Sequence, residues 1–353
     1  MKSNTVALAA ALLSSGLLLG LPAAGPSRDE TPAPVAVAWP TAQRAALPAT
    51  LPDGTAYQPI FFTDAATSVG TAPSPDGKQL RLLVRTEARL RVLRSLPSAA
   101  DPSFQALTGS GATLAWIEST RDGGLSLWTA DASRARRVTT DIGTFRSYRS
   151  ENDLVLADGQ AHWTAVDRSG GTELRSVALS GGPVSVRSTP GSWRLAGWPW
   201  LVDGVTDTRG AAVLRNADTG EQRRITRTPQ AATDCSPDYC RVVSIDDDGW
   251  SRIELMRPDG SGRSTIAEGD VNTAVVDVAP LGRFEIWVRI GSNSDLTGNA
   301  ELLVHEIATN RTVQISPDAG QITYRSGVLW WTAGNLTTFV RHSLDLRTIP
   351  GAP

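Results

Sequence analysis

The chain has 353 residues, of which 41% are hydrophobic and 20% are charged, which is typical of a folded globular protein. A formal net charge of −2 excludes a strongly basic field for nucleic acid and a long acidic tail. The length suits two average domains or one large β-rich domain.

The first residues have the layout of a secretory signal peptide. Met1 and Lys2 give a charged start, an apolar run extends from Val6 to Leu21, and small residues follow up to Gly25. An uncleaved anchor is the alternative, but the run is shorter than the ~20 residues of a spanning helix. We expect a signal peptide over 1–25 and a secreted, extracytoplasmic protein with no transmembrane span once the signal is removed.

Residues 26–55 are rich in Pro and Ala and contain few large apolar side chains. Such a stretch buries too little surface to offset the entropy lost on ordering it. We therefore expect a flexible linker over 26–55, followed by a folded domain over 56–350.

From residue 56 onward, short alternating or apolar runs are separated by turns rich in Gly, Asp, Asn and Pro, which predicts an all-β fold. One block recurs, most clearly over 114–139 and 242–266: an apolar strand, an Asp-Gly turn, an alternating strand and a second turn. The alternating strand returns about every 41 residues, beginning at Leu90, Leu125, Leu174, Ala212, Ile253, Leu302 and Phe339. Because a propeller blade has ~40–45 residues and four strands, we predict a β-propeller of seven four-stranded blades. Six blades are the alternative.

The first and last blades of a propeller have to be joined, because an open sheet edge invites aggregation. The run Tyr57–Phe62 has no obvious place in the first blade. We expect it to close the ring by pairing with the last blade beside Thr338–Arg341. A loose strand that covers one end is the alternative.

Two segments carry a family likeness. Residues 72–80, APSPDGKQL, resemble the S-P-D-G turn of TolB-like (WD40-like) propellers, which joins the innermost strand of a blade to the second. Residues 243–266 resemble the rest of that repeat. The resemblance implies an exported propeller of this class. The helical domain that precedes the TolB propeller has no counterpart in the Pro-rich N-terminal segment, so the resemblance carries no partner.

Both cysteines lie in a turn that aligns with the S-P-D-G turn, with Cys235 and Cys240 as its flanks. The alignment allows them the ~4.4–6.8 Å Cα separation that a disulfide needs, and export favours oxidation. A redox pair would normally read C-x-x-C, and a metal site would need two further ligands. We expect a structural disulfide between Cys235 and Cys240.

The sequence offers no clear catalytic, cofactor-binding or metal-ligating set. His162, His305 and His342 fall in different predicted blades without metal-spaced neighbours, and no G-x-S-x-G motif is present. The acidic run 246–249 lacks the spacing of a calcium loop, so we interpret it as a hairpin turn between the second and third strands of a blade. We therefore predict no catalytic, cofactor or metal residues.

The tryptophans are the most suggestive feature. Trp198, Trp200 and Trp331 are candidates for a ligand surface, because exposed aromatic rings can stack on sugars or capture a peptide. Packing between blades is the alternative for all of them. The neighbours Trp330 and Trp331 must point to opposite faces if they share one strand.

We hypothesise an exported, non-enzymatic propeller that binds another exported protein or an envelope component, without nucleic acid and as a monomer. The alternatives are a carbohydrate-active enzyme, either a lyase or a hydrolase, and a sugar-binding module, each using the channel mouth. Paired carboxylates at that mouth would favour the enzyme. An apolar mouth would favour binding.

Overall fold

The structure is a computed structural model that describes residues 31–122, 124–132, 134–204, 207–292, 294–335 and 338–351. The chain divides into two compact units, Met1–Ala33 and Pro34–Pro353. Only residues 31–33 of the first unit are described, so the predicted signal peptide over 1–25 lies outside the described residues. The second unit carries the β-sheets.

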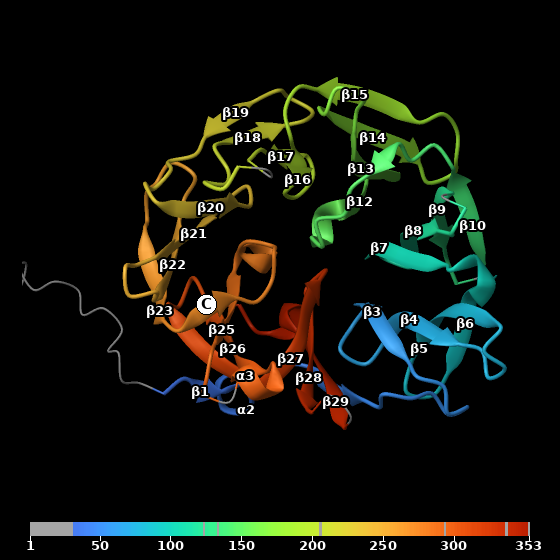
Figure 1. Cartoon of the computed structure of the whole chain (residues 1–353), viewed down its shortest axis with the longest axis horizontal. Coiled ribbons are helices and arrows are strands. Elements are labelled where there is room, and N and C mark those ends of the chain that lie inside the picture. The colour runs from blue at the N-terminus through green and yellow to red at the C-terminus, as the bar shows by residue number, and fades with distance from the viewer. Residues whose placement is uncertain are drawn as a thin grey trace, which may run out of the picture. The chain divides into compact units, whose positions relative to one another are not determined.

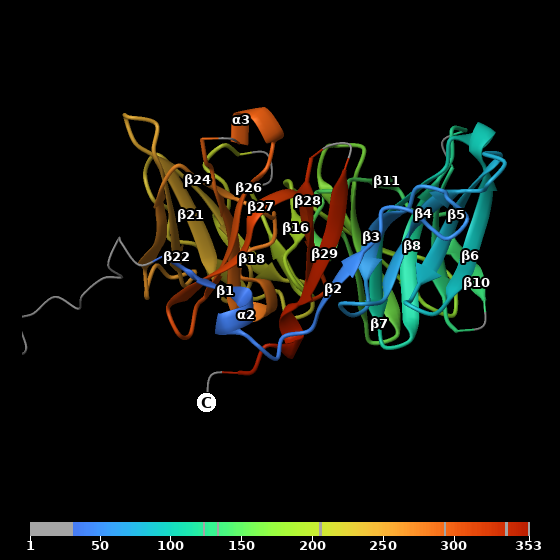
Figure 2. The same ribbon diagram turned by 90° about the horizontal axis from the view of Figure 1, so that it is seen from below.

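The second unit is a β-propeller. Of the chain, 53% is strand and 6% is helix, which confirms the all-β prediction. Antiparallel sheets follow one another along the chain and stand side by side around a centre (Figure 1). Seen from the side, their strands run between the two faces of the ring (Figure 2).

The first two sheets each have four strands in chain order, β3-β4-β5-β6 and β7-β8-β9-β10. In the first sheet the bounds are β3 Gln58–Phe62, β4 Ser68–Pro73, β5 Gln79–Arg85 and β6 Leu90–Pro97. In the second they are β7 Ser103–Ser110, β8 Thr113–Ser119, β9 Leu125–Ala130 and β10 Ala135–Thr139. The 3-10 helix η1 (Ser98–Ala100) links the two sheets.

The next three sheets continue the ring. The third contains β11 (Thr144–Phe145), β12 (Leu154–Ala157), β13 (Gln160–Val166), β14 (Thr172–Ala178) and β15 (Ser185–Thr189), with the 3-10 helix η2 (Glu151–Asp153) before β12. The fourth contains β16 (Arg194–Leu195), β17 (Trp200–Val202), β18 (Val213–Asn216) and β19 (Gln222–Arg224). The fifth contains β20 (Ala231–Cys235), β21 (Cys240–Ile245), β22 (Ser251–Met256) and β23 (Ser264–Gly269).

The last sheet runs in the order β24-β25-β26-β27-β28-β29-β2. Its long strand β27 pairs with β26 through Arg311–Ala319 and with β28 through Gly320–Arg325. The bounds are β24 Val271–Thr273, β25 Phe284–Arg289, β26 Ala300–Glu306, β27 Arg311–Arg325, β28 Val328–Gly334, β29 Phe339–Asp345 and β2 Arg44–Leu47. Short elements complete the fold: β1 Ala33–Pro34, α2 Val35–Ala38, α3 Ser294–Thr297, η3 Pro280–Gly282 and η4 Leu346–Thr348.

Aspartate side chains close several hairpins. Asp246 Oδ1 accepts hydrogen bonds from the N–H groups of Asp248 and Trp250, and Gly249 has a φ of 85°, which suits glycine. This turn joins β21 to β22, the second and third strands of their sheet, as predicted for 246–249. The side chain of Asp167 serves the turn before β14 in the same way.

The prediction of a flexible linker over 26–55 is wrong for the part from Pro34 on. Trp39 is 3% exposed and packs edge-on against Phe284 with ring centroids 5.8 Å apart. Leu47 is buried, and β2 pairs with β29 from Arg44 opposite Leu344 to Leu47 opposite Arg341. A few large apolar side chains order this segment in spite of its Pro and Ala content.

The predicted role of Tyr57–Phe62 as closing strand is also wrong. The strand β3 pairs with β4 in the first sheet, and it is β2 that lies against β29. The alternation in β3 predicted a strand but not its partner, because both candidate neighbours are β-strands with an apolar face.

Two details of the predicted repeat differ as well. Leu90 opens β6, the fourth strand of its sheet, whereas five of the other markers lie in or directly before third strands, and Phe339 opens β29, the sixth strand of the last sheet. The S-P-D-G turn at 74–77 joins β4 to β5, the second and third strands, and not the innermost to the second. The marker fell on β6 because β5 and β6 are consecutive strands with a similar pattern of apolar residues.

No helix in the described part of the chain has the length and hydropathy needed to span a bilayer.

The packing of the N-terminal segment gives a direct test. We expect Trp39→Ala to lower the free energy of unfolding by about 3–5 kcal/mol, because it empties a fully packed site beside Phe284. Val37→Ala is the matched control, since Val37 is 71% exposed and should change stability little. Chemical denaturation of both variants measures the difference. Equal stability of Trp39→Ala and wild type would mean that this segment does not belong to the folded core.

Candidate functional site

A cavity of about 540 Å³ lies where the inner strands of several sheets meet. Its walls come from β3, β7, the second half of β27, β28 and Arg341 of β29 (Phe339–Asp345), together with Ser147, Arg149 and the loop residues 274–277. Figure 1 shows β3, β7 and β27 approaching the centre of the ring from different sheets. The volume falls within the ~300–1,000 Å³ of ligand pockets.

One side of the cavity is apolar. Phe104 and Leu107 of β7 and Trp330 and Trp331 of β28 line it, each no more than 8% exposed. Trp330 packs on Phe62, with ring centroids 5.0 Å apart, whereas Trp331 belongs to a different core cluster. The two neighbouring rings therefore pack into different clusters, as the alternation of a strand predicts.

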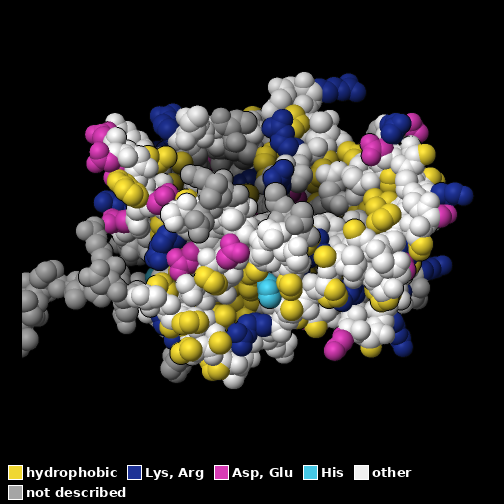
Figure 3. Space-filling view, turned by 60° about the horizontal axis from the view of Figure 1, so that its bottom comes forward, with side chains coloured by type: hydrophobic (Ala, Val, Ile, Leu, Met, Phe, Trp, Pro, Cys, Tyr) yellow, Lys and Arg dark blue, Asp and Glu magenta, His cyan; other side chains and the backbone are white. Residues whose placement is uncertain are grey.

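Three arginines and one acidic residue are the charged groups among the described residues that line this cavity. Arg149 is exposed, Arg325 is half-buried and donates from Nη1 to the carbonyl oxygen of Ser150 at 3.0 Å, and Arg341 is 6% exposed. The acidic residue is Asp277. Over one face of the molecule, by contrast, basic and acidic side chains are interspersed (Figure 3).

Behind Asp277 on the cavity wall, a hydrogen-bond network joins the third and the last sheet. Ser150 Oγ donates to Asp277 Oδ1 at 2.5 Å, and the N–H of Glu151 donates to Asp277 Oδ2 at 3.0 Å. The N–H of Ser326 donates to Glu151 Oε2 at 2.8 Å. Residues far apart in sequence thus hold the loop around η2, the loop before η3 and the end of β27 together.

Two carboxyl groups meet in this network. Burial, followed by the negative charge of Asp277, raises the pKa of Glu151 to about 7. Burial also raises the pKa of Asp153, which accepts from Ser147 Oγ at 2.6 Å. Hydrogen bonds from backbone N–H groups and hydroxyls occupy the carboxyl oxygens of Glu151 and Asp277, so a structural role fits these two residues. The raised pKa of Glu151 also suits an acid–base group.

The loop that carries Asp277 is fixed by a buried ion pair. Arg241 Nη1 donates to Glu285 Oε1 at 2.7 Å, and both side chains are buried. Arg241 also donates from Nη1 to the carbonyl oxygen of Asp277 and from Nη2 to that of Val276, and Glu285 Oε2 accepts from the N–H of Ala279. A buried pair of this kind is satisfied on both sides.

The structure does not bring the three predicted tryptophans together. Trp331 lines the cavity, whereas Trp198 stacks on His162 with ring centroids 3.5 Å apart. Trp200 is 9% exposed and lies beneath the guanidinium of Arg223, 4.1 Å from its ring centroid. Trp198 and Trp200 flank Pro199, which follows a cis peptide bond.

The histidines stay apart, on β13, β26 and β29. Burial lowers the pKa of His162, of His305 to about 4, and of His342. Their contacts are with the rings of Trp198 and Trp331 and with the hydroxyl of Thr312. Among the described residues no group of three or more His, Cys, Asp and Glu side chains could hold a metal ion.

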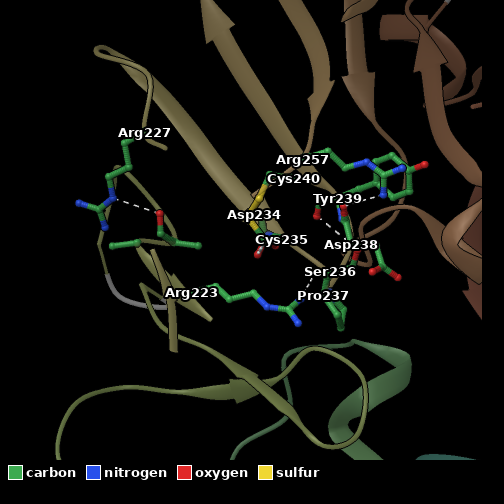
Figure 4. Close-up of a disulfide and its surroundings, with 12 residues drawn as sticks. Arg223, Arg227, Asp234, Cys235, Ser236, Pro237, Asp238, Tyr239, Cys240 and Arg257 are labelled. Carbon is green, nitrogen blue, oxygen red and sulfur yellow. Dashed lines mark hydrogen bonds between the residues drawn. A yellow bond between two sulfur atoms is a disulfide. The ribbon is translucent and has the colours of Figure 1, made fainter. Parts of the chain in front are cut away.

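Cys235 and Cys240 form the predicted disulfide. They are paired residues at the adjoining ends of β20 and β21, with Cα atoms 4.1 Å apart (Figure 4). This turn joins the first and second strands of its sheet, so it is not equivalent to the turn at 74–77. Arg257 lies over the ring of Tyr239, 4.3 Å from its centroid, on the outside of the turn.

The network and the buried Arg341 were missed by sequence reasoning. Ser150 accepts a hydrogen bond from the N–H of Asn152, as an N-cap does, so the S-E-N-D sequence could have indicated a short helix. Nothing in the sequence places it beside Asp277.

No family model matches the chain, and no curated protein matches it. Among solved structures it is similar to an uncharacterized protein from Listeria monocytogenes, with 8% identity and a TM-score of 0.54 over 83% of this chain and 93% of that one. A puromycin-hydrolyzing peptidase from Mycobacterium tuberculosis matches with 11% identity and a TM-score of 0.53, over 91% of this chain and 55% of the peptidase. TolB from Acinetobacter baumannii matches with 9% identity and a TM-score of 0.41, over 72% of this chain and 65% of TolB.

These likenesses show a fold and no activity. A peptidase of which this chain spans about half shares the architecture, so a non-enzymatic role does not follow from it. The TM-score to TolB is too low to bear on the resemblance seen in the turn sequences.

The raised pKa of Glu151 predicts a pH-dependent stability. The folded protein holds this proton up to about pH 7, whereas an ordinary glutamate releases it near 4.5, so the contribution of Glu151 to stability falls between these values as the pH rises. We expect the stability of Glu151→Gln, relative to wild type, to rise by about 1–3 kcal/mol from pH 4.5 to 7.5. Denaturant titrations across this range measure it, with the exposed Glu87→Gln as control. A stability difference between Glu151→Gln and wild type that does not change with pH would contradict the raised pKa of Glu151.

The disulfide predicts two results. The native protein should react with no thiol reagent, and two thiols should appear after unfolding and reduction. Because the bond closes a loop far shorter than the fifteen residues that are worth ~3 kcal/mol, the double variant Cys235→Ala/Cys240→Ala should lose less than that. Two reactive thiols in the native protein would rule out the bond.

Proposed function

We propose that this chain is an exported, non-enzymatic β-propeller that binds another exported protein or a component of the cell envelope through its central cavity. The carrying observation is the composition of the cavity wall, in which Phe104, Trp330 and Trp331 stand beside Arg149 and Arg325. Aromatic residues and arginine are the side chains enriched where proteins bind one another. Of the predicted ligand surface we retain Trp331, because Trp198 and Trp200 pack elsewhere.

The architecture that we propose has seven four-stranded blades. The shared strand β27 supports this number, because its two halves belong to two four-stranded groups, β24-β25-β26-β27 and β27-β28-β29-β2. In this arrangement β2 supplies the outer strand of the last blade and closes the ring. An edge covered in this way is protected from pairing with other chains, which fits a monomer.

The location that we propose is extracytoplasmic. The apolar run after Lys2 supports a signal peptide over 1–25, and the disulfide between Cys235 and Cys240 is typical of oxidising compartments.

A site-specific cross-linking experiment tests the binding role. A photoreactive amino acid replaces Gln321, which is exposed on the cavity wall, or Gln222, which is exposed on β19 away from the cavity. Both mature variants are incubated with the envelope fraction and irradiated. We expect one discrete adduct from position 321 and none from 222, because the partner enters the cavity. Equal labelling from both positions, or none, would contradict the proposal.

A carbohydrate-active enzyme is the second candidate, favoured by the approach of Glu151 and Asp277. In such a lyase or hydrolase the protonated Glu151 would serve as general acid. The test incubates the mature protein and the control Glu151→Gln with acidic and neutral polysaccharides and measures cleavage products. Products formed by the wild type and not by the variant would favour the enzyme over the binding proposal.

A further inference from the structure

Arg341 is a buried cation without a carboxylate partner. Its side chain lines the cavity, the residue is 6% exposed, and no ion pair involves it among the described residues. Nη2 donates to the neutral oxygen Oε1 of Gln58 at 2.9 Å, and buried Nη1 has no hydrogen-bond partner. The ring of Phe339 lies 4.8 Å from the guanidinium carbon.

The other buried arginines of the described chain all have carboxylates. Arg175 is bound by Asp141 and Glu173, both at 2.7 Å. Arg194 pairs with Asp234 at 2.5 Å and Arg241 with Glu285 at 2.7 Å. Arg341 is therefore the exception among the buried arginines of the described residues. A buried charge without a counter-ion is unfavourable.

The surroundings of Arg341 do not supply the missing anion. The groups that interact with it are Gln58, the ring of Phe339 and Tyr57, whose pKa burial raises to about 12, so that its hydroxyl stays neutral. Asp277, the acidic residue of the cavity wall, is already bound by Ser150 and Glu151. The guanidinium has five N–H donors, and one is used by Gln58.

We propose that Arg341 binds the carboxylate of a peptide segment that enters the central cavity. A guanidinium with free donors forms two parallel hydrogen bonds with a carboxylate, and burial strengthens such a pair. The apolar side chains of the segment would contact Phe104, Leu107 and Trp331 on the same cavity wall. This proposal rests on the proposed function, since it names the group by which the partner is recognised.

The size of the cavity limits the ligand. About 540 Å³ admits a few residues of extended chain and no folded domain. The carboxylate therefore belongs to a chain terminus or to an acidic side chain on a protruding segment, and a matched set of peptides separates these two sources.

The experiment uses the mature protein and three acetylated tripeptides in isothermal titration calorimetry. These are Ala-Leu-Val as free acid, Ala-Leu-Val as amide, and Ala-Glu-Val as amide. We expect at least one of the two acidic peptides to bind about tenfold more tightly than Ala-Leu-Val amide. The free acid identifies a C-terminal carboxylate, and the glutamate peptide identifies a side-chain carboxylate.

Variants connect the preference to Arg341. Arg341→Gln should bring the affinity of the acidic peptides down to that of the amide. Arg224→Gln, on the exposed strand β19, is the matched control and should keep the tenfold preference. Equal affinity of wild type for all three peptides, or a preference that survives Arg341→Gln, would overturn the proposal.

A stability measurement needs no ligand. Because Arg341 neutralises no acidic group, Arg341→Met should leave the denaturant midpoint unchanged or raise it. Arg241→Met should lower the midpoint, since it leaves Glu285 unpaired. A large fall for Arg341→Met would show that the arginine serves the fold and would overturn the proposal.

The outcomes separate this proposal from the proposed function. Cross-linking at position 321 without any preference for acidic peptides would retain a binding propeller and remove the role of Arg341. Binding of an acidic oligosaccharide that depends on Arg341, with no binding of peptides, would overturn the peptide proposal.

Discussion

The centre of this propeller depends on the buried ion pair between Arg241 and Glu285. These side chains come from β21 and β25, strands of neighbouring sheets, and each would be strongly unfavourable without the other. Together they bind the backbone of the loop from Val276 to Ala279. That loop presents Asp277 to the loop around η2, so a contact between two sheets fixes a group on the cavity wall.

Because this ion pair fixes Asp277 in a hydrogen-bond network, the acidic and the basic groups of the cavity are in different states. Asp277 accepts hydrogen bonds from Ser150 Oγ and the N–H of Glu151, and Glu151 Oε2 in turn accepts from the N–H of Ser326, which follows β27. On the other side Arg341 has a neutral partner, Gln58. Positive potential is therefore left uncompensated where apolar walls keep the local dielectric low, which strengthens attraction for an anion.

Local chemistry explains which features could be predicted. The Asp-Gly turn at 246–249, the strands beside it and the disulfide depend on residues that are close in sequence, and they were predicted correctly. Pairing over long distances was not predictable in this way. Glu151 and Ser326 meet across 175 positions, and Trp39 is one large ring in a segment whose average composition suggested disorder. Arg341 resembles every other arginine of the chain until the absence of an acid beside it in the described structure is seen.

The position of Arg341 connects ligand binding to the N-terminal segment. Its backbone lies between Thr332 of β28 and Leu47 of β2, and its side chain reaches Gln58 of the first sheet. The strand β2 thus covers the edge of β29 at the residue that faces the cavity. Leu47, opposite Arg341, is fully buried and packs with Trp330, which also lines the cavity. A segment that composition assigned to a linker is therefore paired with the strand that carries Arg341 and packs against the cavity wall.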